Sequence, residues 1–178
     1  MFSGDKGHPM GHGEYVMATT GDFSVHACHE ALPPPKSALA KNIAFAIKSP
    51  YGIIKILPKG RTDLPPGVSL NAVGDILFPH GEIVRGAHRH LNVIIPNATG
   101  RVKGLCGAYN PHRQLRDAFT NASGHVVVAP HYSAGWSDDY KQHFTESFKV
   151  KAADALFTSD ECPPTPPYAP AIPSAHCD

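Results

Sequence analysis

Residues 23–28 read FSVHAC, and in this stretch an apolar side chain alternates with a polar or sulfur-bearing one. A period of two places successive side chains on opposite faces of an extended chain. The stretch therefore predicts a β-strand that buries Phe23, Val25 and Ala27 on one face and turns the intervening residues to the other.

The same alternation recurs at residues 68–72 and 91–95. Residues 52–57 (GIIKIL) are more uniformly apolar, which predicts a central strand covered on both faces. Residues 39–47 fit the spacing of a helix or of a strand. We interpret them as a strand, because residues 49–52 (SPYG) then form a hairpin-like connection to the next strand.

The composition favours many short strands. Proline and glycine contribute 18 and 16 of the 178 residues, a density that suits turns and disfavours long helices. We expect an all-β fold, an antiparallel β-sandwich with a short C-terminal helix within residues 147–157. The expected organisation is an irregular segment at 1–13, a β domain at 14–160 and a proline-rich tail at 161–178.

Charge and hydropathy exclude several classes of protein. The formal net charge is +1 without a long basic block, which argues against nucleic acid as a partner. No apolar run approaches the ~18–20 residues of a membrane-spanning helix. With 42% apolar and 17% charged residues, the chain is not a disordered polar one. The partners expected are extracellular proteins or further copies of the chain.

Four widely spaced cysteines are present: Cys28, Cys106, Cys162 and Cys177. None forms a CxxC pair, which disfavours a zinc or redox site. Their even number predicts two disulfides in an oxidising compartment, with four buried thiols in a cytosolic protein as the alternative. Three pairings are open. A Cys28–Cys106 bond would close a loop of about 80 residues, and Cys162–Cys177 would close the tail.

Two sequons, at Asn97 and Asn121, point to N-glycosylation and a secreted, extracellular protein. Residues 1–6 show neither the basic segment nor the apolar segment of a signal peptide. On the secreted interpretation, we expect the chain to be a piece of a longer protein.

The most specific stretch is residues 102–110 (VKGLCGAYN), followed by 117–120 (DAFT), 123–127 (SGHVV) and 144–150 (FTESFKV). In this order the segments resemble the C-terminal half of the von Willebrand factor type D domain. Residues 13–18 (GEYVMA) and 21–25 (GDFSV) look like that family's early strands, so the resemblance spans about residues 11–157. It implies a non-catalytic extracellular binding or assembly module of a mucin-like, matrix or lipid-transport glycoprotein.

The resemblance also implies a Ca²⁺ site in the loop after GLCG, with Asn110 and Asp117 as ligands. Calcium takes six to eight oxygen ligands, usually with several carboxylates. Here Ala118 replaces one acidic residue of the family pattern, and Arg113 and Arg116 add charge that opposes a divalent ion.

Two other features of this region follow from the residues themselves. Gly104 and Gly107 flank Cys106, which predicts a tight turn and a close approach to a neighbouring segment. Phe148 stands where the family has its closing Trp, so that position stays aromatic.

Twelve histidines make up an unusually large share of the chain. His26 and His29 lie close to Cys28, and His88 and His90 have the spacing of one strand face, which suits zinc or copper chelation. A His-rich metal-binding protein is therefore one alternative function. Solvent-facing histidines on half-exposed strands are the simpler interpretation, and histidines that charge together from about pH 7 to 5 would switch an assembly contact.

Enzyme motifs are missing from the sequence. There is no zincin pair, no G-x-S-x-G elbow, no P-loop and no G-x-G-x-x-G. A catalytic role is not expected. A luciferase-like oxidase is the other alternative, since certain luciferases carry domains of the resembled type, and it predicts a deep apolar pocket with convergent polar groups.

Overall fold

The structure is a computed structural model that describes residues 11–32, 40–96, 102–105, 121–124 and 144–164. These residues form two antiparallel sheets and almost no helix, so the expected all-β fold is confirmed. The first sheet has the order β1-β2-β3-β4-β5 and the second β6-β7-β8-β9. None of the helices among them is long and apolar enough to cross a membrane.

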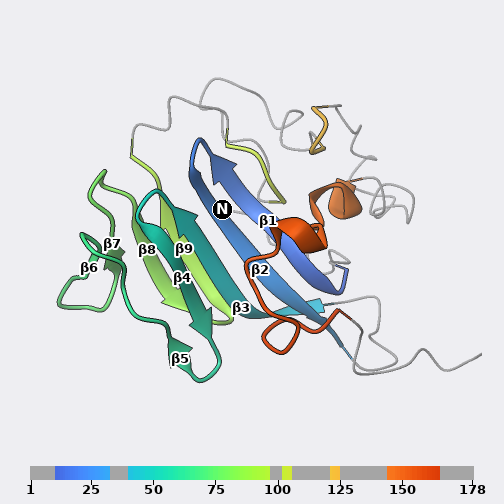
Figure 1. Ribbon diagram of the computed structural model, residues 1–178, viewed down its shortest axis with the longest axis horizontal. Coiled ribbons are helices and arrows are strands. Elements are labelled where there is room, and N and C mark those ends of the chain that lie inside the picture. Colours follow the sequence, from blue (N-terminus) through green and yellow to red (C-terminus); the bar gives the residue numbers. More distant parts are fainter. Residues whose placement is uncertain (1–10, 33–39, 97–101, 106–120, 125–143, 165–178) are drawn as a thin grey trace, which may run out of the picture.

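The first sheet consists of the longer strands, namely β1 (Gly13–Thr20), β2 (Phe23–Ala31), β3 (Ala40–Ser49), β4 (Gly52–Leu57) and β5 (Gly60–Arg61). The second sheet consists of β6 (Ser69–Leu70), β7 (Ile76–Leu77), β8 (Ile83–Ala87) and β9 (His90–Ile94). Within each sheet, every strand pairs with its neighbour in the sequence, so each sheet is a meander. Figure 1 shows the second sheet lying against the β3–β4 side of the first.

Both sheets contribute to one hydrophobic core. Its buried side chains are Phe23, Val25, Ala27, Phe45, Ile47, Ile54, Ile56, Val68, Ile76, Phe78 and Val84. The apolar face predicted for residues 23–27 is therefore confirmed. Phe23 and Phe78 meet edge to face with ring centroids 5.3 Å apart, a geometry that aromatic rings favour, and this contact joins β2 to the segment after β7.

Residues 40–47 belong to β3, while Leu39 lies outside the described residues, and the hairpin to β4 predicted through Pro50 and Tyr51 is confirmed. The prediction that β4 is covered on both faces is wrong. Ile54 and Ile56 are buried, but Ile53 is 45% exposed, because the strap side of β4 is covered only near Lys55 and Leu57. Residues 68–72 form only the two-residue β6, since the chain turns at Asn71.

The short helix expected within residues 147–157 is present in a different form. Two short 3₁₀ turns, η2 (Glu146–Phe148) and η3 (Ala152–Asp154), occupy this region. Between them, Lys149 is extended and forms an antiparallel bridge with Tyr15 of β1, so pairing with the sheet interrupts the helical turns. Phe148 is buried, as expected for the position of the closing aromatic residue.

The outer edge of β1 is covered by later segments of the chain. Lys103 exchanges two backbone hydrogen bonds with Thr19, and the Val150 N–H donates to the Glu14 carbonyl. Gly104 has a φ of +142°, and a Cβ added there would overlap the Met17 carbonyl. Only glycine permits this approach. The close contact predicted for the GLCG stretch is thus confirmed at Gly104, while Gly107 lies outside the described residues.

The face of the first sheet opposite the core is buried too. We define residues 155–162 as the C-terminal strap, which crosses this face and packs Phe157 against β2 and β3. Cys28 of β2 forms a disulfide with Cys162 of the strap, with their Cα atoms 5.6 Å apart. Neither the Cys28–Cys106 bond nor the Cys162–Cys177 bond considered from the sequence forms, because β2 turns Cys28 toward the strap. Cys106 and Cys177 lie outside the described residues.

Reduction of the Cys28–Cys162 disulfide should destabilise the fold strongly. The bond joins residues 134 positions apart, and the chain-entropy model gives about 5 kcal/mol for so long a loop. In a chain carrying Cys106→Ala and Cys177→Ala, dithiothreitol should lower the free energy of urea unfolding by about 3–5 kcal/mol. A matched Cys28→Ala, Cys162→Ala chain reports the effect of reductant on the remaining cysteines. A peptide map of the native chain that links Cys28 to Cys106 would contradict the pairing.

Candidate binding surface

A buried carboxylate holds the strap against the first sheet. Glu14 of β1 lies beside His26 of β2, with Oε1 2.6 Å from Nδ1, so the ring N–H donates to the carboxylate. The Leu156 N–H donates to the same oxygen at 2.9 Å, and the Phe157 N–H donates to Oε2 at 3.4 Å. Two backbone amides of the strap therefore depend on one side chain of β1.

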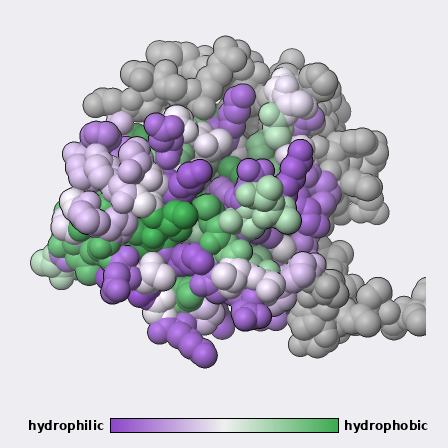
Figure 2. All heavy atoms as spheres, viewed as in Figure 1, coloured by the Kyte–Doolittle hydropathy of each residue, from purple (hydrophilic) through white to green (hydrophobic). Residues whose placement is uncertain are grey.

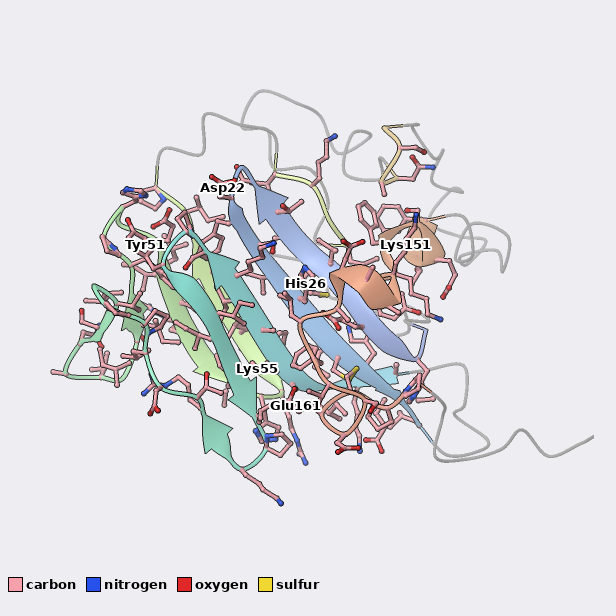
Figure 3. All side chains as sticks on the ribbon, in the orientation of Figure 1. Asp22, His26, Tyr51, Lys55, Lys151 and Glu161 are labelled. Atoms are coloured by element: carbon pink, nitrogen blue, oxygen red, sulfur yellow. A yellow bond between two sulfur atoms is a disulfide. The ribbon has the colours of Figure 1, made fainter. Side chains whose placement is uncertain are left out.

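An ion pair also holds the strap near its end. The Lys55 Nζ of β4 lies 2.6 Å from the Glu161 Oε2, as Figure 3 shows at the lower side of the molecule. Partial burial opposes ionisation of Glu161, but Lys55 and the Thr158 N–H hydrogen-bond to its carboxylate and lower its pKa below the ordinary value. Glu14, Cys28 and Lys55 thus fasten the strap to three strands of one face.

Two aromatic rings are buried on the core side of β1 and β2, outside the hydrophobic core that the two sheets share. Tyr15 and His29 stack with ring centroids 5.0 Å apart, and both are fully buried. The Tyr15 hydroxyl donates to Glu146 Oε1 at 2.8 Å. Burial, together with this bond and the Glu146 charge, raises the pKa of Tyr15. Tyr15 thereby links β1 to η2.

The His29 ring is buried without hydrogen bonds to offset its loss of contact with water. Neither ring nitrogen makes a hydrogen bond, and burial lowers the pKa of its ring to about 4. Asn42 and the Gly11 backbone lie beside the ring and oppose part of this shift without reaching hydrogen-bond geometry, whereas the charge of His12 adds to it. The ring is therefore neutral near pH 7 and contributes packing rather than charge.

An open pocket of about 250 Å³ lies where β4 and β5 of the first sheet face β7 and β8 of the second. Its walls are mostly apolar and are made by Ile56, Leu57, Pro58, Ile76, Val84 and Ala87. Three glycines complete the lining. A Cβ added at Gly60 or Gly74 would meet nothing within 4 Å, so the space beside these two glycines is empty.

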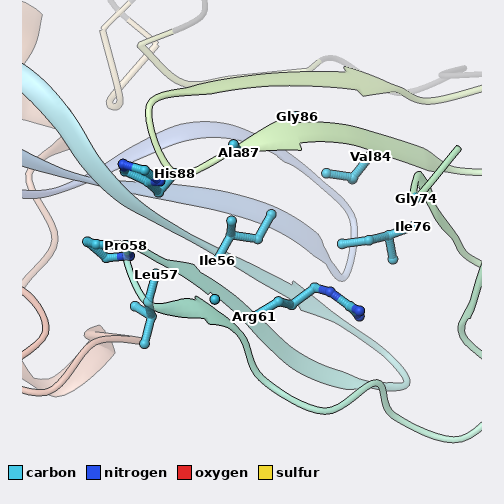
Figure 4. Close-up of a pocket in the computed structure, with 11 residues that line it drawn as sticks. Ile56, Leu57, Pro58, Arg61, Gly74, Ile76, Val84, Gly86, Ala87 and His88 are labelled. Carbon is cyan, nitrogen blue, oxygen red and sulfur yellow. The ribbon is translucent and has the colours of Figure 1, made fainter.

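Two polar side chains frame this pocket. Figure 4 shows Arg61 extending from β5 toward Ile76, while His88 lies at the opposite end beside Pro58. Arg61 is exposed and has no ion-pair partner among the described residues. The pocket therefore combines apolar walls with an available guanidinium at its rim, an arrangement that suits an apolar group next to a hydrogen-bond acceptor or an anion.

The turn between β6 and β7 borders the same pocket through Gly74. Its Asn71 Oδ1 accepts hydrogen bonds from the Val73 and Asp75 N–H groups, at 3.0 and 2.9 Å. Val73 at the tip is 80% exposed. Figure 2 shows apolar residues gathered over β4 and, at the margin of the molecule, over the β6–β7 region. Apolar surface at such a site marks a contact surface more often than isolated exposed residues do.

Of the site residues expected from the sequence, the structure brings Cys28 and Cys162 together. Asn121 lies in a partly exposed turn, where the Ser123 hydroxyl donates to its Oδ1 at 2.9 Å. Asn97, Asn110 and Asp117 lie outside the described residues, so glycosylation at Asn97 and Asn121 and the calcium ligands stay predictions.

The histidines differ from their expected placement. His26 and His29 are buried rather than facing solvent, because the strap covers one face of β2 and the stacked Tyr15 covers part of the other. His88 lies in the turn between β8 and β9 and not on a strand face with His90. No group of three or more His, Cys, Asp or Glu side chains in the described ranges is placed to hold a metal ion.

Arg61 and Val73 were not singled out from the sequence. The pocket joins residues 56–61 to residues 74–88, and no local pattern reveals such a meeting of two sheets. The Asn71–Asp75 turn could have been found from the sequence, since Asn and Gly favour tight turns and such turns expose the residues between them. No protein-family model and no curated protein sequence matches the chain.

The buried His29 should make stability fall as the solution is acidified. A His with a folded pKa of about 4 and an unfolded pKa of 6.5 disfavours folding once the unfolded state takes up the proton. Its contribution is intact above pH 6.5 and is lost progressively as the pH falls toward 4, in total about 3 kcal/mol. His29→Phe keeps the stack on Tyr15 and should flatten this part of the stability profile measured by urea unfolding.

His90→Phe is the matched control, since His90 is exposed and its replacement should leave the pH profile of the native chain unchanged. A His29→Phe chain that loses as much stability between pH 6.5 and 4 as the native chain would show that the ring is not buried in its neutral form.

Proposed function

We propose that this chain is a secreted, non-catalytic module that binds proteins outside the cell, of the von Willebrand factor type D kind. The observation that carries the proposal is the open apolar pocket between the two sheets, with Arg61 unpaired among the described residues at its rim. The order of the GLCG, DAFT and FTESFKV segments supports the family assignment.

The disulfide supports the extracellular part of the proposal. Disulfides persist in oxidising compartments and are rare in the cytosol. The Cys28–Cys162 bond is buried under the strap at the end of the described chain. Asn121 adds a sequon in a partly exposed turn, where an oligosaccharide would meet solvent and not the core.

The size of the pocket favours a side chain of a protein partner as its occupant. Sites for small organic ligands usually enclose the whole ligand in about 300–1,000 Å³, whereas this pocket has about 250 Å³ and is open, so it can hold one ring or side chain of a larger molecule without enclosing the rest. Protein interfaces, by contrast, place one or two anchor side chains in pockets of the partner. Arg61 would then pair with a carboxylate or carbonyl next to that anchor.

The buried ionisable groups support a role without catalysis. The Glu14 carboxylate is engaged by His26 and by two amides of the strap, and Tyr15 is engaged by Glu146. These partners belong to the fold itself, so each group is used to hold segments together. Among the described ionisable groups, His29 and the Glu82 Oε2 are buried without hydrogen bonds, and neither residue lines the pocket.

Anilinonaphthalene sulfonate, an aromatic anion whose fluorescence rises in apolar sites, tests whether the pocket binds. The native chain should bind it, and Ala87→Phe should weaken binding because the added ring fills the pocket from β8. Arg61→Gln should weaken binding about three- to tenfold through loss of the charge at the rim, while Lys59→Gln, the same change at a residue that does not line the pocket, should have little effect.

Titrations are to be followed both by fluorescence and by isothermal calorimetry, on oxidised chain whose sheet content is checked by circular dichroism. Equal affinities for the native chain, Ala87→Phe and Arg61→Gln would overturn the assignment of this pocket as the binding site.

A further inference from the structure

A serine lies beside the His26–Glu14 pair that holds the strap. Ser24 and His26 are two residues apart in β2, and this spacing places both side chains on the same face of the first sheet. The Ser24 Oγ lies 3.5 Å from the His26 Nε2, while the Nδ1 of the same ring lies 2.6 Å from the Glu14 Oε1. The hydroxyl, the imidazole and the carboxylate therefore form one chain of polar contacts, in the order that activated serines require.

The hydrogen bonds around Glu14 determine which nitrogen of His26 carries the proton. The Leu156 and Phe157 N–H groups donate to this carboxylate, and a carboxylate only accepts, so the ring also donates to it, from Nδ1. A neutral ring with its proton on Nδ1 has a lone pair on Nε2. That lone pair faces the Ser24 hydroxyl, which is the position of a general base.

Ser24 is the member of this group that outside molecules can reach. Glu14 and His26 are buried, whereas Ser24 is partly exposed. The strap is fastened at the Cys28 end of β2, and Figure 3 shows His26 midway along the strand, with Asp22 at the turn that precedes it. Ser24 lies between His26 and that turn, away from the disulfide. The base is thus shielded from water while the hydroxyl beside it is accessible.

The neighbours of Ser24 across the sheet suit an acyl group. Lys48 of β3 pairs directly with Ser24, and Ile53 of β4 pairs directly with Lys48. Directly paired residues share one face of a sheet, so the three side chains form a row, in which Lys48 and Ile53 are exposed. An ammonium next to a nucleophile stabilises the negative charge that develops on a carbonyl oxygen under attack. Ile53 adds an apolar surface for a short acyl chain.

We propose that Ser24 is a nucleophile that takes an acyl group from an activated ester or thioester, with His26 as its general base. The Ser24 Oγ forms a bond to the carbonyl carbon, and its proton passes to the His26 Nε2. The bond from that carbon to the leaving oxygen or sulfur then breaks, and the leaving group takes the proton from His26. The products are an ester of Ser24 and a free alcohol or thiol, so each chain reacts once. This inference goes beyond the proposed binding role and does not rest on the pocket between the sheets.

Acetylation of the oxidised full chain by p-nitrophenyl acetate tests the inference, with peptide mapping to locate each acetyl group. Ser24 should be acetylated at least a hundredfold faster than Ser69, an exposed serine of β6, because general base catalysis contributes about 10²–10⁴-fold. Both serines are compared within the native chain, so this measurement does not depend on the folding of a variant.

Three variants separate the roles of the neighbouring side chains. His26→Gln should lower the rate of Ser24 acetylation about a hundredfold or more, since glutamine can donate to Glu14 but is not a base. Lys48→Gln should lower this rate roughly tenfold, because the ammonium is exposed and therefore screened. Lys59→Gln, the same change at an exposed lysine between β4 and β5, should leave the rate unchanged. Circular dichroism checks that each variant keeps its sheets.

The proton on the His26 ring gives a second measurement. Nitrogen-15 spectra of the native chain should show Nδ1 protonated and Nε2 bare. Glu14→Gln should shift the ring toward the opposite tautomer and slow the acetylation of Ser24, because the glutamine amide can donate to Nδ1. If Glu14 served only to hold the strap, its replacement would leave the tautomer unchanged.

Two outcomes overturn the inference. One is a native chain in which Ser24 reacts no faster than Ser69, and the other is a native His26 ring that carries its proton on Nε2. Release of p-nitrophenol in excess of the acetyl groups bound, lost in Ser24→Ala, would retain Ser24 as the nucleophile and overturn the non-catalytic part of the proposed function. A reactive Ser24 in a chain that does not bind anilinonaphthalene sulfonate would also retain this inference while removing the pocket as a binding site.

Discussion

The Glu14 carboxylate and the Cys28–Cys162 disulfide fasten the end of the described chain to its beginning, and the rest of the structure depends on this connection. A buried carboxylate is costly unless its oxygens are hydrogen-bonded. Here Glu14 receives bonds from His26 and from the Leu156 and Phe157 amides. Removal of the strap would leave Glu14 with His26 as its one remaining partner in the described chain and would uncover one face of the first sheet, so the strap and the sheet stabilise each other.

The strap also explains why β2 has the sequence it has. Its core face is apolar in the usual way, but its other face carries Ser24, His26 and Cys28, which in a two-sheet sandwich would ordinarily meet water. In this chain that face meets a third layer. His26 supplies a hydrogen bond to Glu14 and Cys28 supplies the covalent bond to Cys162. The polar half of the alternation is thus a second, more polar interior.

This layer marks the limit of what the sequence predicts. The period of two identified β2 and β9 and the core side of β2, because that signal is local. The covering of His26 and the pairing of Cys28 with Cys162 depend on a contact between residues far apart in the chain, and three pairings fit the cysteine count equally well. The prediction that Ile53 is buried was wrong for the same reason, since an apolar run does not reveal whether another layer of the structure covers it.

The proposed binding surface was less predictable than the fold, yet the position of its pocket follows from the same constraint. The strap fastens β1, β2 and β4 on one face, and Glu14, Lys55 and Glu161 are occupied there in holding it. The short strands β5 to β7 receive no such cover, and they leave Arg61 and Val73 exposed around an apolar recess. The contacts that stabilise the fold and the proposed binding surface thereby lie on different parts of the sandwich. The turn at Asn71 is held by its own hydrogen bonds and by Arg85, so the exposed surface is both apolar and ordered. A specific contact requires this order, because a surface fixed before binding loses little conformational entropy.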